Sequence, residues 1–276
     1  MIEAFNWFLN GVVDGIMWPW GGEWPWPGLM VASLLTAALL VAIFRVTSNQ
    51  GEIRRSRNRF LARALELLLF QHDLRVSLTA CGRIIVANLK YLGHFLVPTA
   101  ASLLPLLLIF VQLESWFDRR PLKVGESAVV VVELDPSQPV VSASASISAA
   151  SMAQVDSPAV RIPAQNEIAW RVVASDEGVG WVEVTADGQT ERKSFVAGTH
   201  LIRTSIRRDQ RGFISQLLNP FERPLPTVGP IRRIEVWYPP REIFIGDRKI
   251  PWLAAAVLLM MVFGLVIGRL AGVRIA

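Results

Sequence analysis

The sequence predicts an α-helical membrane protein of three transmembrane helices and a cytoplasmic helical hairpin, with an extracytoplasmic immunoglobulin-like β-sandwich. Three apolar runs contain no Asp, Glu, Lys or Arg, at residues 28–44, 91–113 and 251–268. Each is long enough for a helix to cross a bilayer core about 30 Å thick. The composition agrees, because 52% of the 276 residues are hydrophobic and the mean hydropathy is +0.38. Those values are too apolar for a soluble domain alone, yet they leave room for one beside the spans.

The distribution of charge predicts the side of the membrane on which each connecting segment lies. Residues 1–28 carry three acidic and no basic residues, whereas 45–90 carry nine basic against three acidic ones. Residues 114–250 hold 17 residues of each sign, and the tail 269–276 adds two arginines. Since basic segments stay in the cytoplasm, we expect a membrane protein with its N-terminus and 114–250 outside and its C-terminus inside. The pI near 10.0 then reflects topology, and no specific nucleic-acid sequence is expected as a partner.

Residues 1–27 predict a helix lying on the outer membrane surface and a tryptophan-rich linker. Two faces are visible at helical spacing, an apolar one (Ile2, Phe5, Phe8, Val12, Ile16) and a polar one (Glu3, Asn6, Asn10, Asp14). The segment "PWGGEWPWPG" ends this helix before span one at 28–45. Tryptophans near the ends of the spans indicate an aromatic belt at the headgroup level.

Residues 46–90 predict two amphipathic helices joined by a short turn at "QHD". Two helices of roughly 20 residues pair as an antiparallel coiled-coil hairpin about 30 Å long. Its basic residues also anchor span one, and the main ones are Arg54, Arg55, Arg59 and Arg63. Spans two and three follow at 91–113 and 251–268. The motif Gly264-x-x-x-Gly268 in span three is typical of close helix packing.

The β domain is expected between the second and third spans, at 114–250. Its short β-rich runs include "SAVVVVELDP", "NEIAWRVVAS" and "GWVEVTADGQ", with turn signals between them. Either Trp170 or Trp181 fills the core of the predicted sandwich. Residues 214–230 are predicted to be an insertion, with one short helical turn followed by a proline-rich connector.

No catalytic or metal-binding constellation is found in the sequence, so we expect a non-enzymatic protein without cofactors. The histidines, His72, His94 and His200, fall in the hairpin turn, in span two and in the β domain. HExxH, CxxC, GxSxG and Walker A motifs do not occur. The single cysteine, Cys81, allows no intramolecular disulfide.

Polar residues at membrane depth are the remaining candidates for function. Ser33 and Thr36 share one face of span one, while His94 and Ser102 lie in span two. Together they predict a semi-polar groove between these spans, open to the cytoplasm, with Arg45 at its mouth. The alternative explanations are local: Arg45 as an interfacial anchor, and Ser and Thr hydroxyls bonded to their own helices.

The order of these elements resembles a known family. An outer amphipathic helix, a span ending in "AIFRVTSNQ", a basic hairpin "EIRRSRNRFLARALELLLFQHDLRVSL" and a second span are similar to the YidC/Oxa superfamily of membrane insertases. The similarity extends to its archaeal and endoplasmic-reticulum three-span members. It implies that Arg45 provides the positive charge of a hydrophilic groove and that the hairpin receives substrate. The chain differs in carrying a β domain between spans two and three.

Three functions follow as hypotheses. The first is an insertase-like chaperone of the bacterial inner membrane. It would assist insertion or assembly of client transmembrane segments through the groove between spans one and two, with the bilayer and the ribosome as further partners. The second is a non-enzymatic scaffold subunit of an envelope complex, which binds a partner through the β domain and a cytoplasmic one, such as an ATPase, through the hairpin. The third is a membrane-anchored binding protein for extracytoplasmic ligands.

Overall fold

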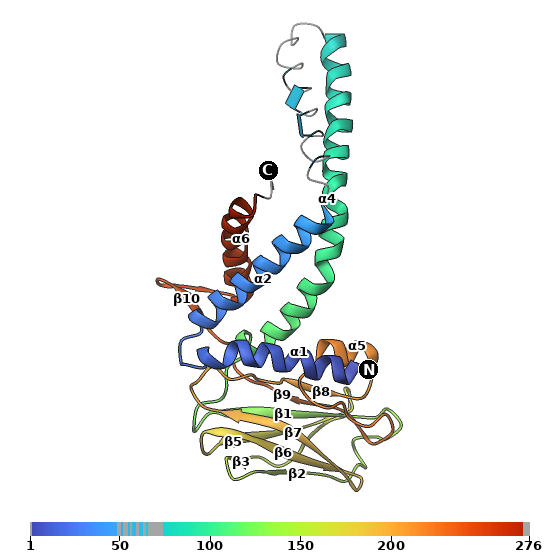
Figure 1. Ribbon diagram of the computed structural model, residues 1–276. Coiled ribbons are helices and arrows are strands. Elements are labelled where there is room, and N and C mark those ends of the chain that lie inside the picture. The colour runs from blue at the N-terminus through green and yellow to red at the C-terminus, as the bar shows by residue number, and fades with distance from the viewer. Residues whose placement is uncertain are drawn as a thin grey trace. The chain divides into compact units, whose positions relative to one another are not determined.

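The computed structural model describes residues 2–48 and 74–272 and, between them, residues 51, 55, 57–58, 61–62 and 65. The chain divides into two compact units. The first, called the β unit below, comprises Met1–Ala32 and Phe110–Ala255, and the second, the helical unit, comprises Ser33–Ile109 and Ala256–Ala276. The predicted combination of apolar helices with antiparallel sheets is confirmed (Figure 1).

Within the described residues, three helices are long and apolar enough to cross a membrane. They are α2 (Trp26–Thr47), α4 (Leu74–Phe117) and α6 (Trp252–Leu270). The helix α4 has 44 residues and runs without a break from the expected second arm of the hairpin through span two. Pro98 and Pro105 lie inside it without ending it. The turn "QHD" and most of the first hairpin arm lie outside the described residues.

Two antiparallel sheets form the body of the β unit. The larger has the order β3–β5–β1–β9–β8, with β4 also paired to β5, and the smaller has the order β2–β6–β7. The bounds in the larger sheet are β1 Ser127–Leu134, β3 Ala153–Val155, β4 Val160–Ile162, β5 Glu167–Ala174, β8 Arg207–Asp209 and β9 Ile231–Val236. Those in the smaller are β2 Ala145–Ala149, β6 Gly178–Ala186 and β7 Gln189–Ala197. A separate hairpin, β10 (Ile243–Ile245) with β11 (Arg248–Ile250), precedes α6.

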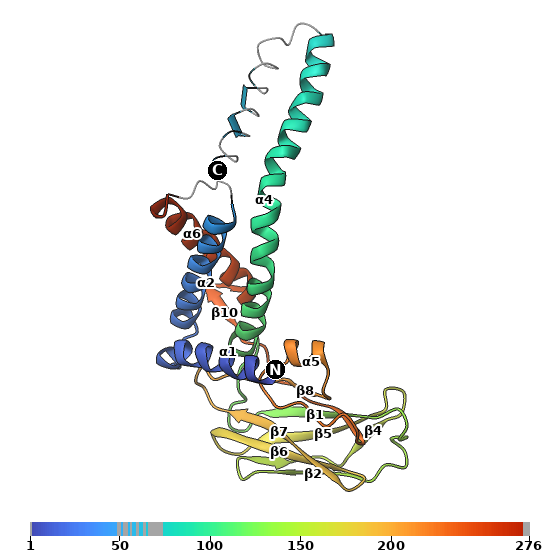
Figure 2. The same ribbon diagram turned by 45° about the vertical axis from the view of Figure 1, so that its right-hand side comes forward.

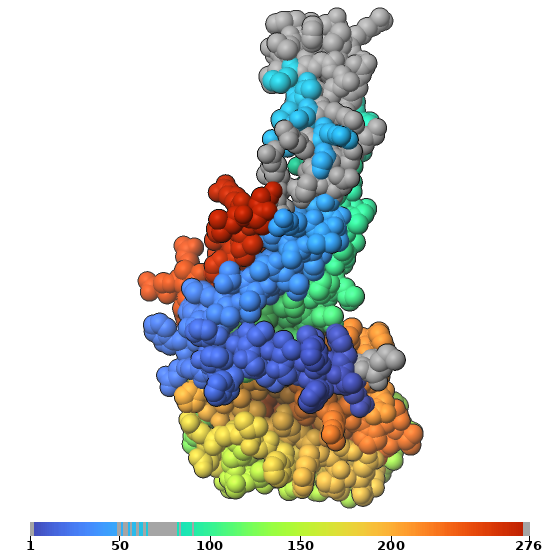
Figure 3. Space-filling model, viewed as in Figure 1, coloured from blue at the N-terminus to red at the C-terminus, as the bar shows by residue number. Residues whose placement is uncertain are grey.

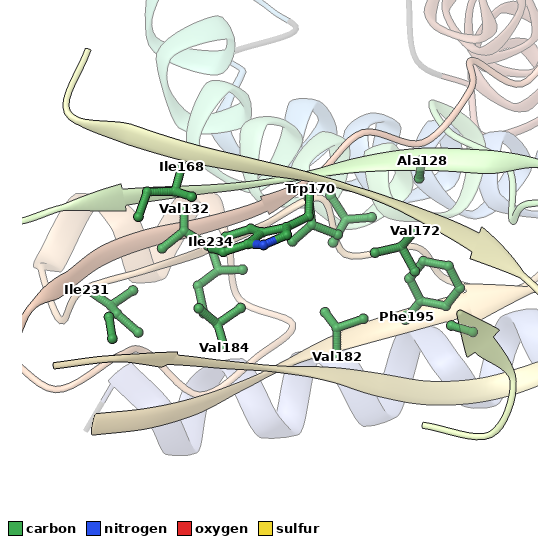
Figure 4. Close-up of a cluster of buried hydrophobic side chains, with 14 of the residues drawn as sticks. Ala128, Val132, Ile168, Trp170, Val172, Val182, Val184, Phe195, Ile231 and Ile234 are labelled. Carbon is green, nitrogen blue, oxygen red and sulfur yellow. The ribbon is translucent and has the colours of Figure 1, made fainter. Parts of the chain in front are cut away.

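The core lies between the two sheets (Figure 4). Alternate residues of β1, β5 and β9 from one sheet meet those of β6 and β7 from the other, as expected for strands with one buried face. Trp170 is 4% exposed and fills this core, whereas Trp181 is 45% exposed on the outer face, with Arg192 5.0 Å from its ring centroid. The β6–β7 turn uses Asp187 and Gly188, both with positive φ, as a tight hairpin requires.

Two helices outside the sandwich complete the β unit. They are α1 (Ile2–Met17), which continues into the short 3₁₀ helix η1 (Trp18–Trp20), and α5 (Phe213–Leu218). The helical turn predicted at the start of residues 214–230 is present as α5, which begins at Phe213, one residue before the predicted insertion. Figure 3 shows α1 lying across the body of the β unit rather than apart from it.

Candidate functional site

The helical unit contains a recess between its apolar helices. It has a volume of about 200 Å³ and lies among α2, α4 and α6. Its lining is almost entirely apolar, and its members are Ala37, Leu40, Val41, Phe44, Pro98, Thr99, Ser102, Met260 and Gly264. The hydroxyl of Ser102 donates to the carbonyl oxygen of Pro98 at 2.8 Å, so this polar group is already bonded within its own helix.

The residues predicted to line a groove do not come together as expected. Ser33 and Thr36 are 0% and 4% exposed, so they face the interior and do not line the recess. Arg45, which follows the recess-lining Phe44, is exposed. His94 is half-buried and lies one helical turn from Pro98, which also lines the recess. Of the five predicted groove residues, only Ser102 lines the recess. The recess between these helices is therefore mainly apolar.

Aromatic side chains fill the space between α2 and α4 beside this recess. The rings of Phe44 and Phe95 are stacked with centroids 5.9 Å apart, and Tyr91 contacts Phe95 edge-on at 5.1 Å. Such contacts close the gap between the two spans near Arg45. They leave the guanidinium at the helix surface, where an interfacial anchor would lie.

The predicted glycine motif is split between two environments. Gly268 is buried, whereas a Cβ built on Gly264 would meet no atom within 4 Å. Gly264 therefore lines the recess and makes no close helix contact. In the hairpin, Arg55 is helical and exposed, while Arg54, Arg59 and Arg63 lie outside the described residues.

The β unit contains a second constellation, which the sequence did not reveal: the polar face of α1 binds the β domain. The side-chain amides of Asn6 and Asn10 donate to the backbone carbonyls of Gln216 and Pro220, at 2.7 and 2.8 Å. Glu3 pairs with Arg211 at 2.7 Å. Buried backbone carbonyls need donors, so these asparagines satisfy one carbonyl within α5 and one in the connector that follows it.

Arg203 is the centre of this interface. Its guanidinium pairs with Asp14 at 2.6 Å and lies 5.6 and 4.8 Å from the ring centroids of Trp116 and Phe221. Burial lowers the pKa of Arg203, and Asp14 opposes that shift; burial also raises the pKa of Asp14. Gln112 from α4 donates to the Asn10 side chain at 2.9 Å. One arginine therefore links α1, the end of α4 and the β domain.

A buried ion pair fixes the proline-rich connector to the sheet. Lys193 of β7 is 0% exposed and pairs with Glu222, and its ammonium also donates to the carbonyl of Ser205 at 2.6 Å. Burial raises the pKa of Glu222, but Lys193 and the Ser194 hydroxyl more than reverse this, so the pKa lies below its ordinary value. Because Lys193 is fully buried and its ammonium is bonded to both Glu222 and Ser205, the pair is explained as structural.

Only part of this second constellation had a signal in the sequence. Glu3, Asn6, Asn10 and Asp14 form a visible polar stripe, but their partners are roughly 190 to 210 residues away. Among the described residues, no group of three His, Cys, Asp or Glu side chains is arranged to hold a metal ion. No protein-family model matches the chain, and neither a curated protein nor a solved structure does.

Proposed function

We propose that the protein is an insertase-like chaperone of the bacterial inner membrane that holds client transmembrane segments against the recess of the helical unit. The N-terminus and an immunoglobulin-like β domain would lie outside and the hairpin in the cytoplasm. The observation that carries this proposal is the recess itself, an opening of about 200 Å³ that three apolar helices leave unfilled. The resemblance of the chain to the YidC/Oxa superfamily rests on the order of its elements and on Arg45.

The lining of the recess determines what it can do for a client. An unsatisfied polar group in lipid costs several kcal/mol, whereas one hydrogen bond between helices in a membrane contributes only about 0.6–2 kcal/mol. The hydroxyls of Thr99 and Ser102 can therefore offset a small part of that cost. The recess would act mainly by packing apolar side chains, and the exposed Arg45 and Arg55 would attract acidic flanking residues.

Site-specific photocrosslinking in living cells tests this function. Probes at Thr99 and Ser102 should yield ladders of many nascent chains, because both positions line the recess. A probe at Leu103 is the matched control, since this neighbour on α4 is 54% exposed and does not line the recess. Equal patterns at Ser102 and Leu103, or none from either recess position, would count against a client site.

A scaffold subunit of an envelope complex is the second candidate, and the α1 interface favours it. The polar contacts of Asn6, Asn10 and Arg203 hold α1, the end of α4 and the β domain together as one body suited to present a partner surface. Purification of the full chain from native membranes separates the two functions. A stoichiometric partner that stays bound supports the scaffold, and its absence together with crosslinked nascent chains supports the chaperone.

A further inference from the structure

The outward face of α1 is apolar. The polar residues of this helix are turned towards the β domain, as the contacts of Asn6, Asn10 and Asp14 show. On the opposite side, Phe5, Phe8 and Val12 are 45%, 63% and 42% exposed, and the remaining exposed residues of that side are alanine and glycine. An amphipathic helix on a soluble domain has the reverse arrangement, with its apolar face packed and its polar face in water.

The short helix α5 exposes apolar side chains beside α1. Phe213, Ile214 and Leu218 are 68%, 68% and 53% exposed on a helix of six residues. The bond from Asn6 to the carbonyl of Gln216 joins the two helices directly. Figures 1 and 2 both show α5 at the level of α1, above the sheets of the β unit. Large apolar side chains gathered on two neighbouring helices indicate an interaction surface.

The ends of the three apolar helices lie on the same side of the β unit. Phe117 at the end of α4 is fully buried and stacks on Trp252 of α6 with centroids 6.4 Å apart. A Cβ on Gly28 of α2 would lie 3.5 Å from the Phe117 ring, so the start of α2 joins them. Trp18 and Trp24 in the adjoining linker are 84% and 76% exposed, as expected for tryptophans at the headgroup level.

We propose that the outward face of α1 and the apolar residues of α5 form a single surface that is embedded in the outer headgroup–acyl boundary of the bilayer. Helices of this kind bury their apolar face about 5–10 Å into that boundary. A lipid surface is favoured over a protein partner for two reasons: the exposed side of α1 has no charge to specify a partner, and three apolar helices leave the β unit beside it. The proposal depends on those helices spanning a membrane and is independent of the chaperone function.

This surface gives the insertion a role. The connector after α5 is attached to the sheet by the Lys193–Glu222 pair and to α1 by the carbonyl of Pro220. Contact of α5 with lipid would therefore be transmitted to β7 through fixed contacts. The β domain would be held at a set height and rotation against the membrane, with the exposed face of its smaller sheet turned to the aqueous side.

Fluorescence quenching in vesicles tests the proposal on the full chain. Single-cysteine variants Phe8→Cys, Phe213→Cys and Val179→Cys, made in a Cys81→Ser background, would carry a small environment-sensitive dye. The vesicles would contain phosphatidylethanolamine and phosphatidylglycerol. Val179 is the control, because it is 66% exposed and apolar but lies on β6, away from both helices.

The expected result is a reciprocal pattern. Dyes at residues 8 and 213 should be quenched by lipids that carry a spin label near the headgroup end of the acyl chain, and they should be shielded from aqueous iodide. The dye at residue 179 should show the opposite behaviour. Iodide access at residue 213 equal to that at residue 179 would overturn the proposal and would leave a protein partner to cover α5. Because these side chains are exposed, labelling them leaves the core packing intact.

Discussion

The α1 interface of the β unit is polar, whereas the recess of the helical unit is apolar. At the interface, Asn6, Asn10 and Arg203 each bond to a group from a distant part of the chain. At the recess, only Thr99 and Ser102 among nine lining residues are polar, and Ser102 is bonded within α4. The difference shows that the polar residues of α1 fix the architecture of the β unit, whereas the recess left open in the helical unit is apolar.

The largest effect that follows from this comparison is expected at the buried pair of the β unit. Glu222→Gln should lower the free energy of unfolding of the β unit by about 3–5 kcal/mol, because Lys193 is left buried and uncompensated. Urea unfolding followed by near-UV circular dichroism measures this. Glu242→Gln is the matched control, since its pair with Lys249 is exposed, and it should leave the unfolding curve unchanged. Equal curves for both variants would show that the connector is not attached through this pair.

A smaller loss is expected at the centre of the α1 interface. Arg203→Met should destabilise the β unit by about 2–3 kcal/mol, because the half-exposed Asp14 can partly regain water while the contacts to Trp116 and Phe221 are weakened. Hydrogen exchange should rise selectively in α1. Arg192→Met, which removes an exposed cation beside Trp181, is the control. Unchanged exchange in α1 would mean that the asparagine contacts suffice.

A substitution at the recess should raise stability, in contrast to the two substitutions above. Gly264→Ala should stabilise α6 by about 0.5–1 kcal/mol, because a Cβ there meets no neighbour and alanine favours a helix. Gly264→Leu should fill the recess and abolish crosslinks from Ser102 while the protein still folds. Leu265→Ala, on an exposed side of the same helix, should leave the crosslinks intact. Persistent crosslinks in Gly264→Leu would place the client elsewhere.

The smallest effect concerns the half-buried pair of Arg120 and Glu126. Two hydrogen bonds from Arg120, both 2.7 Å, lower the pKa of Glu126 from 4.5 to about 2. The stabilisation is therefore complete above the unfolded value of 4.5 and is lost as pH falls towards about 2. Solvent screens this pair, so the loss should be about 1 kcal/mol or less. Unfolding curves between pH 5 and pH 2 should change less with pH in Glu126→Gln, and identical slopes would contradict the assignment.

The helices and the sheet faces could be predicted because they depend on local periodicity. The apolar stripe of Phe5, Phe8 and Val12 predicted the helix α1 correctly. The alternation of apolar and polar residues predicted a strand at Trp170, which lies in β5. The β10–β11 hairpin was missed because its strands have only three residues each. A run of three residues is too short to show a period.

The contacts across the sequence could not be predicted. Periodicity distinguishes the two faces of α1 but does not say which face meets lipid and which meets protein, since Arg203 is 189 residues from Asp14. For the same reason Ser33 and Thr36 were expected in a groove, although both are buried. A small hydroxyl suits a close helix contact as well as it suits a polar lining.

The uninterrupted helix α4 also has a mechanical consequence. At about 1.5 Å per residue its 44 residues make a rod about 66 Å long, roughly twice the thickness of a bilayer core. Pro98 and Pro105 each lack a backbone N–H donor, so bending of α4 would be concentrated at these two positions.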